Sequence, residues 1–313
     1  MEGIGEDRIK SRKKCWKRLG VILMIVILLG SLGFNAYLVF FGGDSLLWRT
    51  YLQSPKEIEI MELGVLRAHA NFREGEALAF QYDFANEEYP LLLSKYEIEK
   101  TAGGGSALDR ALRLMDAYSG RLTHRSSIKI EPDQMNALYL LDYSLDQKEH
   151  GIYCRAKAQI LNEMCLALGI YARKVWINPI SAYDSDCHVV NEVWDEGYGQ
   201  WIMLDITNNS YWIDETGKPL SVLEIHDLLS QHAFCTPAEP GDDLSSPEKL
   251  KEKHLDTYLY IAKNMVYMEY MGSYTVGETE PYYMLFPEGL PTKYTLFVSR
   301  ESVEARPQHL NER

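Results

Sequence analysis

Three short stretches decide the fold of this chain: Gly151-Ile-Tyr-Cys154, Cys187-His-Val-Val-Asn-Glu-Val193 and Trp201-Ile-Met-Leu-Asp-Ile-Thr207. The first opens a run with helical periodicity, and the other two have the composition of neighbouring strands. They bring a cysteine at a helix start, a histidine on one strand and an aspartate on the next. These are the groups that a thiol acyl-transfer site requires.

The cysteine is expected in the first turn of a helix over residues 153–168, which Gly169 ends. The free amide groups and the dipole of a helix start favour an anion there, so the thiolate of Cys154 should form readily. A cysteine by itself is more often an inert core residue. Cys165, three turns along the same helix, is expected to be core.

The two strands form a hairpin whose register follows from its turn. A loop at Glu196-Gly-Tyr-Gly199 pairs Asp195 with Gln200. Continued along both strands, this register puts His188 and Asp205 on one face, because side chains alternate with a period of two. A carboxylate in that position would hold the tautomer of the imidazole. A histidine or an aspartate alone is more often structural. The interpretation as a catalytic triad depends on finding the cysteine, the histidine and the aspartate together in this order.

The three stretches resemble the transglutaminase-like core superfamily, relatives of the papain-like thiol proteases. Such cores show a glycine before the cysteine, Leu-Gly-Ile-x-Ala-Arg after the helix, His-Ala-Trp-Asn-Glu-Val and Trp-x-x-Leu-Asp-Pro-Thr. The helix here is followed by Leu168-Gly-Ile-Tyr-Ala-Arg173. The resemblance implies an α+β fold in which the catalytic helix packs on an antiparallel sheet. It also implies that Cys154 is the nucleophile, His188 the general base and acid, and Asp205 the orienting carboxylate.

Two positions depart from the family pattern. Val190 stands where an aromatic residue is usual, and Ile206 replaces the proline. Neither change removes a catalytic group, but Val190 should reshape the pocket beside the histidine. For the oxyanion donors, the backbone amide of Cys154 is one candidate on geometric grounds. The side chains of Gln147 and Tyr153 are weaker ones.

A 23-residue run without charge, Leu19 to Phe41, precedes this core. At 1.5 Å per residue a helix of that length covers about 34 Å, enough to span a bilayer. A cleaved signal peptide is the rival interpretation, but its apolar region would be shorter and would end in small residues. Residues 1–18 hold seven Lys or Arg and three Asp or Glu, which predicts a cytoplasmic amino terminus and a catalytic domain outside.

The rest of the chain is expected to support the core. Two capping boxes are predicted at Ser106 and Ser221, and Asp133 is expected to cap another helix. A long helix over 247–271, strands over 282–286 and 293–298, and a frayed tail from Ser299 should follow. The predicted segments are a basic tail (1–18), a transmembrane helix (19–41), a region of uncertain fold (42–105), the catalytic core (106–240) and a C-terminal part packed on it (241–313).

Composition narrows the function further. The net charge is −13, and the basic tail leaves the remainder more acidic still, which argues against a nucleic-acid partner. The five cysteines form no CxxC or Cys/His ligand cluster, so neither a structural zinc nor another cofactor is expected.

Two functions remain. The first is a thiol enzyme acting on a protein or peptide, with cell-wall peptides among the candidates, for which hydrolysis ranks above cross-linking transamidation. The second is a catalytically silent ectodomain that binds a peptide or cell-wall polymer. Aromatic residues near the core would line its groove: Tyr183, Tyr198, Tyr211 and Trp212.

Overall fold

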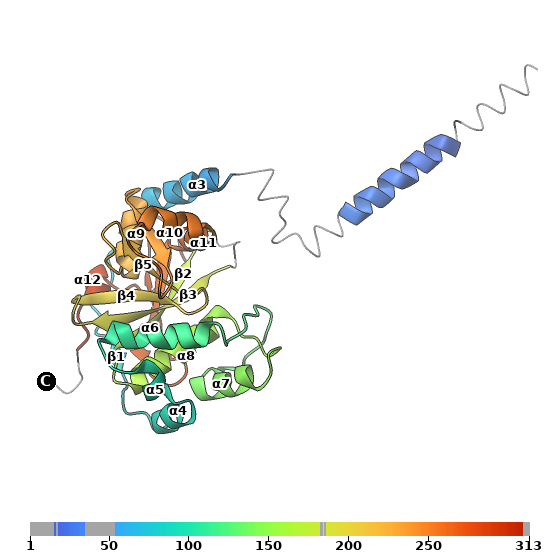
Figure 1. Cartoon of the computed structure of the whole chain (residues 1–313). Helices are drawn as coiled ribbons and strands as arrows, with labels where there is room; N and C mark the ends of the chain where they lie inside the picture. The colour runs from blue at the N-terminus through green and yellow to red at the C-terminus, as the bar shows by residue number, and fades with distance from the viewer. Residues whose placement is uncertain (1–15, 17, 35–53, 182–183, 185, 309–313) are drawn as a thin grey trace, which may run out of the picture. The chain divides into compact units, whose positions relative to one another are not determined.

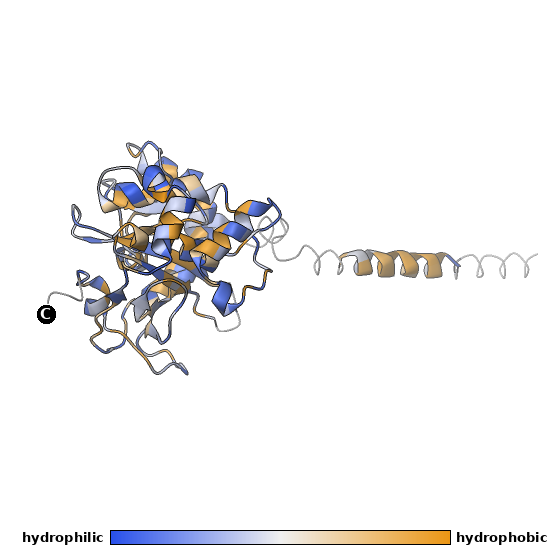
Figure 2. Ribbon diagram, turned by 90° about the horizontal axis from the view of Figure 1, so that it is seen from below, coloured by the Kyte–Doolittle hydropathy of each residue, from blue (hydrophilic) through white to orange (hydrophobic). Residues whose placement is uncertain are grey.

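The computed structural model describes residue 16 and residues 18–34, 54–181, 184 and 186–308. The chain divides into two compact units, Met1–Ile58 and Glu59–Arg313. In the first unit residues 18–34 are helical, and their apolar side chains are exposed (Figure 2, orange). Among the described residues, no helix combines the length and the apolar character that crossing a bilayer requires. Residues 35–41 of the expected anchor lie outside the described residues.

A seven-stranded sheet forms the centre of the second unit, in the order β6-β5-β4-β3-β2-β7-β9, and every neighbouring pair is antiparallel. The α+β class with an antiparallel sheet is therefore confirmed. The strands are β2 (Ala172–Asn178), β3 (His188–Asp195), β4 (Gln200–Asp205), β5 (Ser210–Asp214), β6 (Cys235–Ala238), β7 (Tyr267–Met271) and β9 (Tyr282–Leu285). A separate parallel pair joins β1 (Gln81–Tyr82) to β8 (Ser273–Tyr274).

Helices cover both faces of the sheet (Figure 1). Val189 and Val193 of β3 face one core, whereas Val190 faces the other, as the period of two requires. The first core takes side chains from α4 (Tyr89–Lys95), α5 (Ile98–Ala102), α6 (Ala107–Ser119), α7 (Ala137–Asp146) and α8 (Cys154–Ala167). The second core takes side chains from α3 (Pro55–Ala68), α9 (Val222–Ser230), α11 (Leu255–Asn264) and α12 (Arg300–Glu304), and α10 (Pro247–Lys253) adjoins β6.

The predicted hairpin register is the observed one. Asp195 pairs with Gln200, and the ladder continues to Asn191 opposite Leu204. It ends there because the carboxylate of Asp205 accepts hydrogen bonds from the backbone amides that follow it, which turns the chain. β4 therefore ends two residues before the end of the predicted stretch from Trp201 to Thr207.

The two predicted capping boxes are present. Ser106 accepts from the amide of Asp109, and Ser221 accepts from that of Glu224. The cap predicted at Asp133 is wrong, because Asn136 is the N-cap of α7. Asp133 lies instead in a short 3-10 turn, Pro132–Gln134.

The C-terminal part differs most from expectation. The predicted helix over 247–271 is two helices that meet at His254, followed by β7. Residues 293–298 form only two isolated bridges, through Phe297 and Val298. The predicted frayed tail begins instead with a helix, since Ser299 caps α12 and Val303 is buried, and residues 309–313 lie outside the described residues.

Candidate active site

The site lies at the end of the sheet where β3 begins and β4 ends. His188 is the first residue of β3 and Asp205 the last of β4, so the antiparallel pairing brings them together. The Nε2 atom of His188 lies 2.8 Å from Oδ2 of Asp205. Both residues are buried, with 2% and 0% of their surface exposed. His188 and Asp205 therefore lie on the same face of the hairpin, as the alternation of side chains predicted.

A third residue holds the carboxylate of Asp205, and sequence reasoning missed it. Asn208 donates from Nδ2 to Oδ2 at 2.7 Å, while the amides of Thr207 and Asn208 donate to Oδ1 at 2.9 and 3.3 Å. Burial tends to raise the pKa of Asp205, but His188 and these donors outweigh it and lower that pKa. The signal was available, because an aspartate that closes a strand often receives the amides two and three residues later.

Cys154 is the first residue of α8 and therefore lies in its first turn, as predicted. No side chain caps this helix start, so the first-turn amides keep their capacity to stabilise an anion. The side chain is partly exposed. It is near enough to His188 to help raise the pKa of the imidazole. Since Nε2 of the imidazole serves Asp205, Nδ1 is the nitrogen left for the thiol.

The charge of His188 is stabilised by its two partners. Burial lowers the pKa of the imidazole, but Asp205 and Cys154 raise it to about 10. The imidazolium is therefore the favoured form at neutral pH. A protonated histidine between a thiol and a carboxylate can support a thiolate and later release a proton.

Several neighbours position these groups. The ring of Tyr260, on α11, stands edge-on to the His188 ring at 5.3 Å between centroids. Asn191 ties β3 to α8 by donating from Nδ2 to the carbonyl of Ala158 at 2.9 Å. These contacts fix the strand that carries the histidine relative to the helix that carries the cysteine.

Gly151 allows another segment to approach the site. A Cβ atom at this position would lie 2.8 Å from Cβ of Arg125 and 3.1 Å from the carbonyl oxygen of Thr123. The close approach permits the pairing of Ile152 with the 123–125 segment, which brings His124 beside the triad. A side chain at residue 151 would therefore clash with the 123–125 segment, which explains the glycine of the first motif.

Other residues singled out from the sequence have different positions. Gln147 is exposed, and its amide group donates to Asp146 at 3.3 Å. Cys165 is fully buried, as expected of core. Of the suggested groove aromatics, Trp212 is fully buried, and Tyr183 lies outside the described residues.

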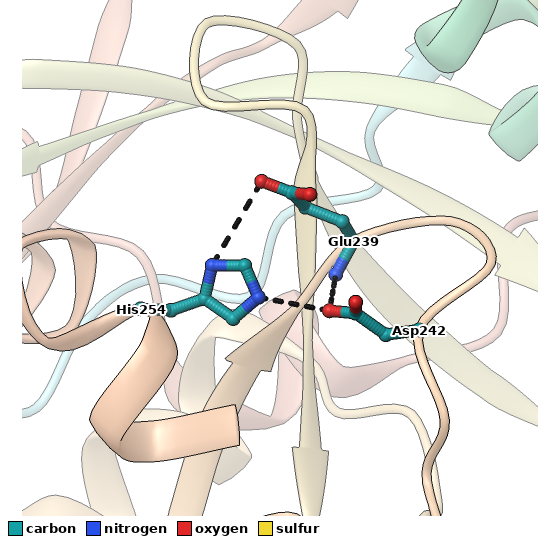
Figure 3. A group of neighbouring side chains, drawn as sticks. All are labelled: Glu239, Asp242 and His254. Carbon is teal, nitrogen blue, oxygen red and sulfur yellow. Dashed lines mark hydrogen bonds and ion pairs between the residues drawn. The ribbon is translucent and has the colours of Figure 1, made fainter. Parts of the chain in front are cut away.

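One group elsewhere has the geometry of metal ligands: Glu239, Asp242 and His254 (Figure 3). His254 Nε2 lies 2.8 Å from Oδ2 of Asp242. Both carboxylates also face Lys253, whose Nζ lies 2.6 Å from Asp242 Oδ1 and 3.4 Å from Glu239 Oε2. Because Lys253 and His254 already bind the carboxylates, the group is best explained as a polar cluster that joins the loop after β6 to the α10–α11 junction.

Comparison with known proteins agrees with this geometry. Residues 94–206 match the model of the transglutaminase-like superfamily, a segment that contains Cys154, His188 and Asp205. No curated protein matches the sequence. The crystal structure of a Cytophaga hutchinsonii protein, provisionally described as a cysteine protease, is similar over 50% of this chain and 52% of that one, with 17% identity and a TM-score of 0.32. This chain therefore spans about half the length of that protein.

Proposed function

We propose that this protein is a thiol enzyme that cleaves or transfers an amide acyl group, with Cys154, His188 and Asp205 as its triad. The observation that carries the proposal is the position of His188. Its Nε2 lies 2.8 Å from a buried carboxylate, and Cys154, at a helix N-terminus, is near enough to help raise the pKa of its ring. This is the relation of nucleophile, base and orienting group that covalent acyl transfer requires.

In the first half of the reaction the thiolate of Cys154 attacks the amide carbonyl. The C–S bond forms, and the negative charge on the carbonyl oxygen is stabilised by the first-turn amides of α8. The imidazolium of His188 gives its proton to the leaving nitrogen, the C–N bond breaks, and an amine departs. Asp205 and Asn208 keep the imidazole in place through both steps.

In the second half an acceptor attacks the thioester while His188 takes its proton, the C–S bond breaks, and Cys154 leaves as the thiolate. Water gives a carboxylic acid, and a primary amine gives a new amide. We rank hydrolysis first, because the resemblance to the superfamily implies that many bacterial members hydrolyse. The substrate is a protein or peptide, with cell-wall peptides as one candidate class.

The location outside the membrane is part of the same proposal. It is supported by the uncharged run Leu19 to Phe41 and by the basic residues before it, which would keep the amino terminus in the cytoplasm. Protease added to intact cells should degrade the domain after residue 41 if this is right. Protection from protease until the cells are lysed would reject the location without touching the chemistry.

The chemistry is tested with a peptide library and an added primary amine. Full-length protein is incubated with both, and products are read by mass. A gain of water indicates hydrolysis, and a gain of amine indicates transamidation. Cys154→Ala should abolish both products and the labelling of that position by a thiol reagent at neutral pH.

A matched control is Cys165→Ala, which removes a thiol from the same helix in the core. It should retain turnover if it folds. Turnover by Cys154→Ala would reject the proposal. Absence of any turnover in the wild type, with peptide binding undiminished in Cys154→Ala, would favour the catalytically silent binding domain.

A further inference from the structure

The described part of the chain buries three lysine or arginine side chains: Lys157, Arg173 and Lys174. Arg173 pairs with Glu192, with 2.6 Å between Nη2 and Oε2, and Lys174 pairs with Glu278. Lys157 is only 2% exposed. Yet no residue among those described accepts a hydrogen bond from its Nζ or forms an ion pair with it. Its Nζ is not among the fully buried polar atoms that lack a partner, so the ammonium end keeps some access to solvent while the rest of the side chain is buried. A largely buried cation without a partner is costly, and such groups often mark a functional site.

Lys157 lies in the first turn of α8, three residues after Cys154. Residues three apart share one face of a helix, so both side chains point to the same side. The two charged groups that act on Lys157 are those of Asp205 and Cys154. Burial lowers the pKa of Lys157, and these two groups oppose that effect only in part. The cation therefore lies beside the triad and is incompletely compensated.

Asp205 does not supply the missing partner. Its two oxygens already accept four hydrogen bonds, from His188, the amide of Thr207, and the amide and side chain of Asn208. Lys157 also acts on His124, whose pKa is lowered by burial and by the lysine. His124 is therefore neutral at physiological pH and offers no negative charge.

We infer that Lys157 binds a carboxylate of the substrate, next to the amide bond that Cys154 attacks. This inference rests on the proposed function. One helical turn is 5.4 Å, so the carboxylate would lie within a few bonds of the reacting carbonyl. The preferred substrates are then peptides with an acidic side chain or a free α-carboxylate beside the cleaved bond. An anion would also supply the charge that burial of Lys157 demands.

A pair of alkylating reagents tests this without knowledge of the substrate. Iodoacetate and iodoacetamide have nearly the same shape, but only iodoacetate carries a carboxylate. In both reactions the thiolate forms a C–S bond and iodide leaves. The readout is the ratio of the two rates at Cys154, measured on full-length protein by mass of the cysteine peptide. Any general change in thiol reactivity cancels in this ratio.

The iodoacetate-to-iodoacetamide ratio should be higher for the protein than for a free cysteine peptide. In Lys157→Met it should fall about tenfold, the order expected for removing one nearby charge from a partly buried site. Lys157→Arg should keep most of it. Lys148→Met, which removes an exposed lysine six residues before Cys154, is the matched control and should not change it. Should Lys157→Met fail to fold, Lys157→Gln replaces it.

Two results would overturn the inference. One is a wild-type ratio no higher than that of the free peptide. The other is an equal fall of both rates in Lys157→Met, since it would mean that the lysine acts only on the thiolate. Lack of alkylation at Cys154 by either reagent would instead reject the proposed nucleophile. The two failures are therefore distinguishable.

Discussion

Replacing Asp205 by asparagine removes the negative charge of this residue but keeps nearly the same shape. The carboxylate lies 2.8 Å from His188 and, after burial, is the largest influence on the pKa of the imidazole. Two unit charges about 4 Å apart, at an effective dielectric constant of about 20, interact by about 4 kcal/mol. At about 1.4 kcal/mol per pH unit, this corresponds to roughly three units. Burial remains in the variant and favours the neutral ring.

We therefore expect the pKa of His188 in Asp205→Asn to fall by about two to three units from the wild-type value of about 10. The assay is the rate of alkylation of Cys154 by iodoacetamide between about pH 5 and 11. This rate should change where His188 loses its proton, because the thiolate then loses its cationic neighbour. The position of that step gives the pKa, whatever the direction of the rate change.

The control is Asp133→Asn, the same loss of charge at an exposed position. Its step should stay at the wild-type pH. Asp205 is fully buried, so the asparagine should also cost about 1–3 kcal/mol in unfolding free energy, measured by denaturant. If the step occurs at the same pH in Asp205→Asn and in the wild type, the carboxylate does not hold the charge of His188, and the reasoning about the triad fails.

Three further outcomes are expected. Asn208→Ala should lower turnover about tenfold and leave peptide KM nearly unchanged, because it loosens the carboxylate and touches no substrate; an unchanged kcat would contradict this. Arg173→Met should lower the unfolding free energy by about 3–5 kcal/mol, since it leaves Glu192 buried without its cation, and denaturant melts measure this. The raised pKa of His188 should contribute stability that is fully present below pH 6.5 and is lost as the pH rises towards about 10. Melts across that range, compared with His188→Gln, test the sign.

The sequence was most informative where local rules decide the geometry. The turn at Glu196–Gly199 fixed the register of the hairpin, and a period of two then determined which residues share a face. Capping boxes at Ser106 and Ser221 were predictable for the same reason, since the donor and the acceptor are three residues apart. The candidate triad follows from these local relations and from one helix start.

Two misses are local, the cap at Asn136 and the bond from Asn208 to Asp205, but the others concern contacts between distant residues. Tyr267–Met271 reads as a continuation of a helix, but it pairs with β2 on one side and β9 on the other, so the sheet overrides its local preference. α12 was taken for a frayed tail, although its Val303 is buried and its carbonyl accepts from Arg173 at 2.9 Å. The burial of Lys157 was equally invisible, because it depends on what packs around the first turn of α8.

The polar residues of the third strand explain how the site keeps its geometry. Asn191 and Glu192 are adjacent, so they point to opposite faces of β3. Asn191 bonds to α8 through Ala158, whereas Glu192 bonds to Arg173 on β2 and, through Oε1 at 2.8 Å, to the amide of Val222 at the start of α9. The strand is thus fixed to both helical layers and to its neighbour within four residues of His188. A slip of β3 by one residue would break all of these bonds at once and would move the imidazole to the wrong face. The Asn-Glu pair of the motif therefore protects the register on which the candidate chemistry depends.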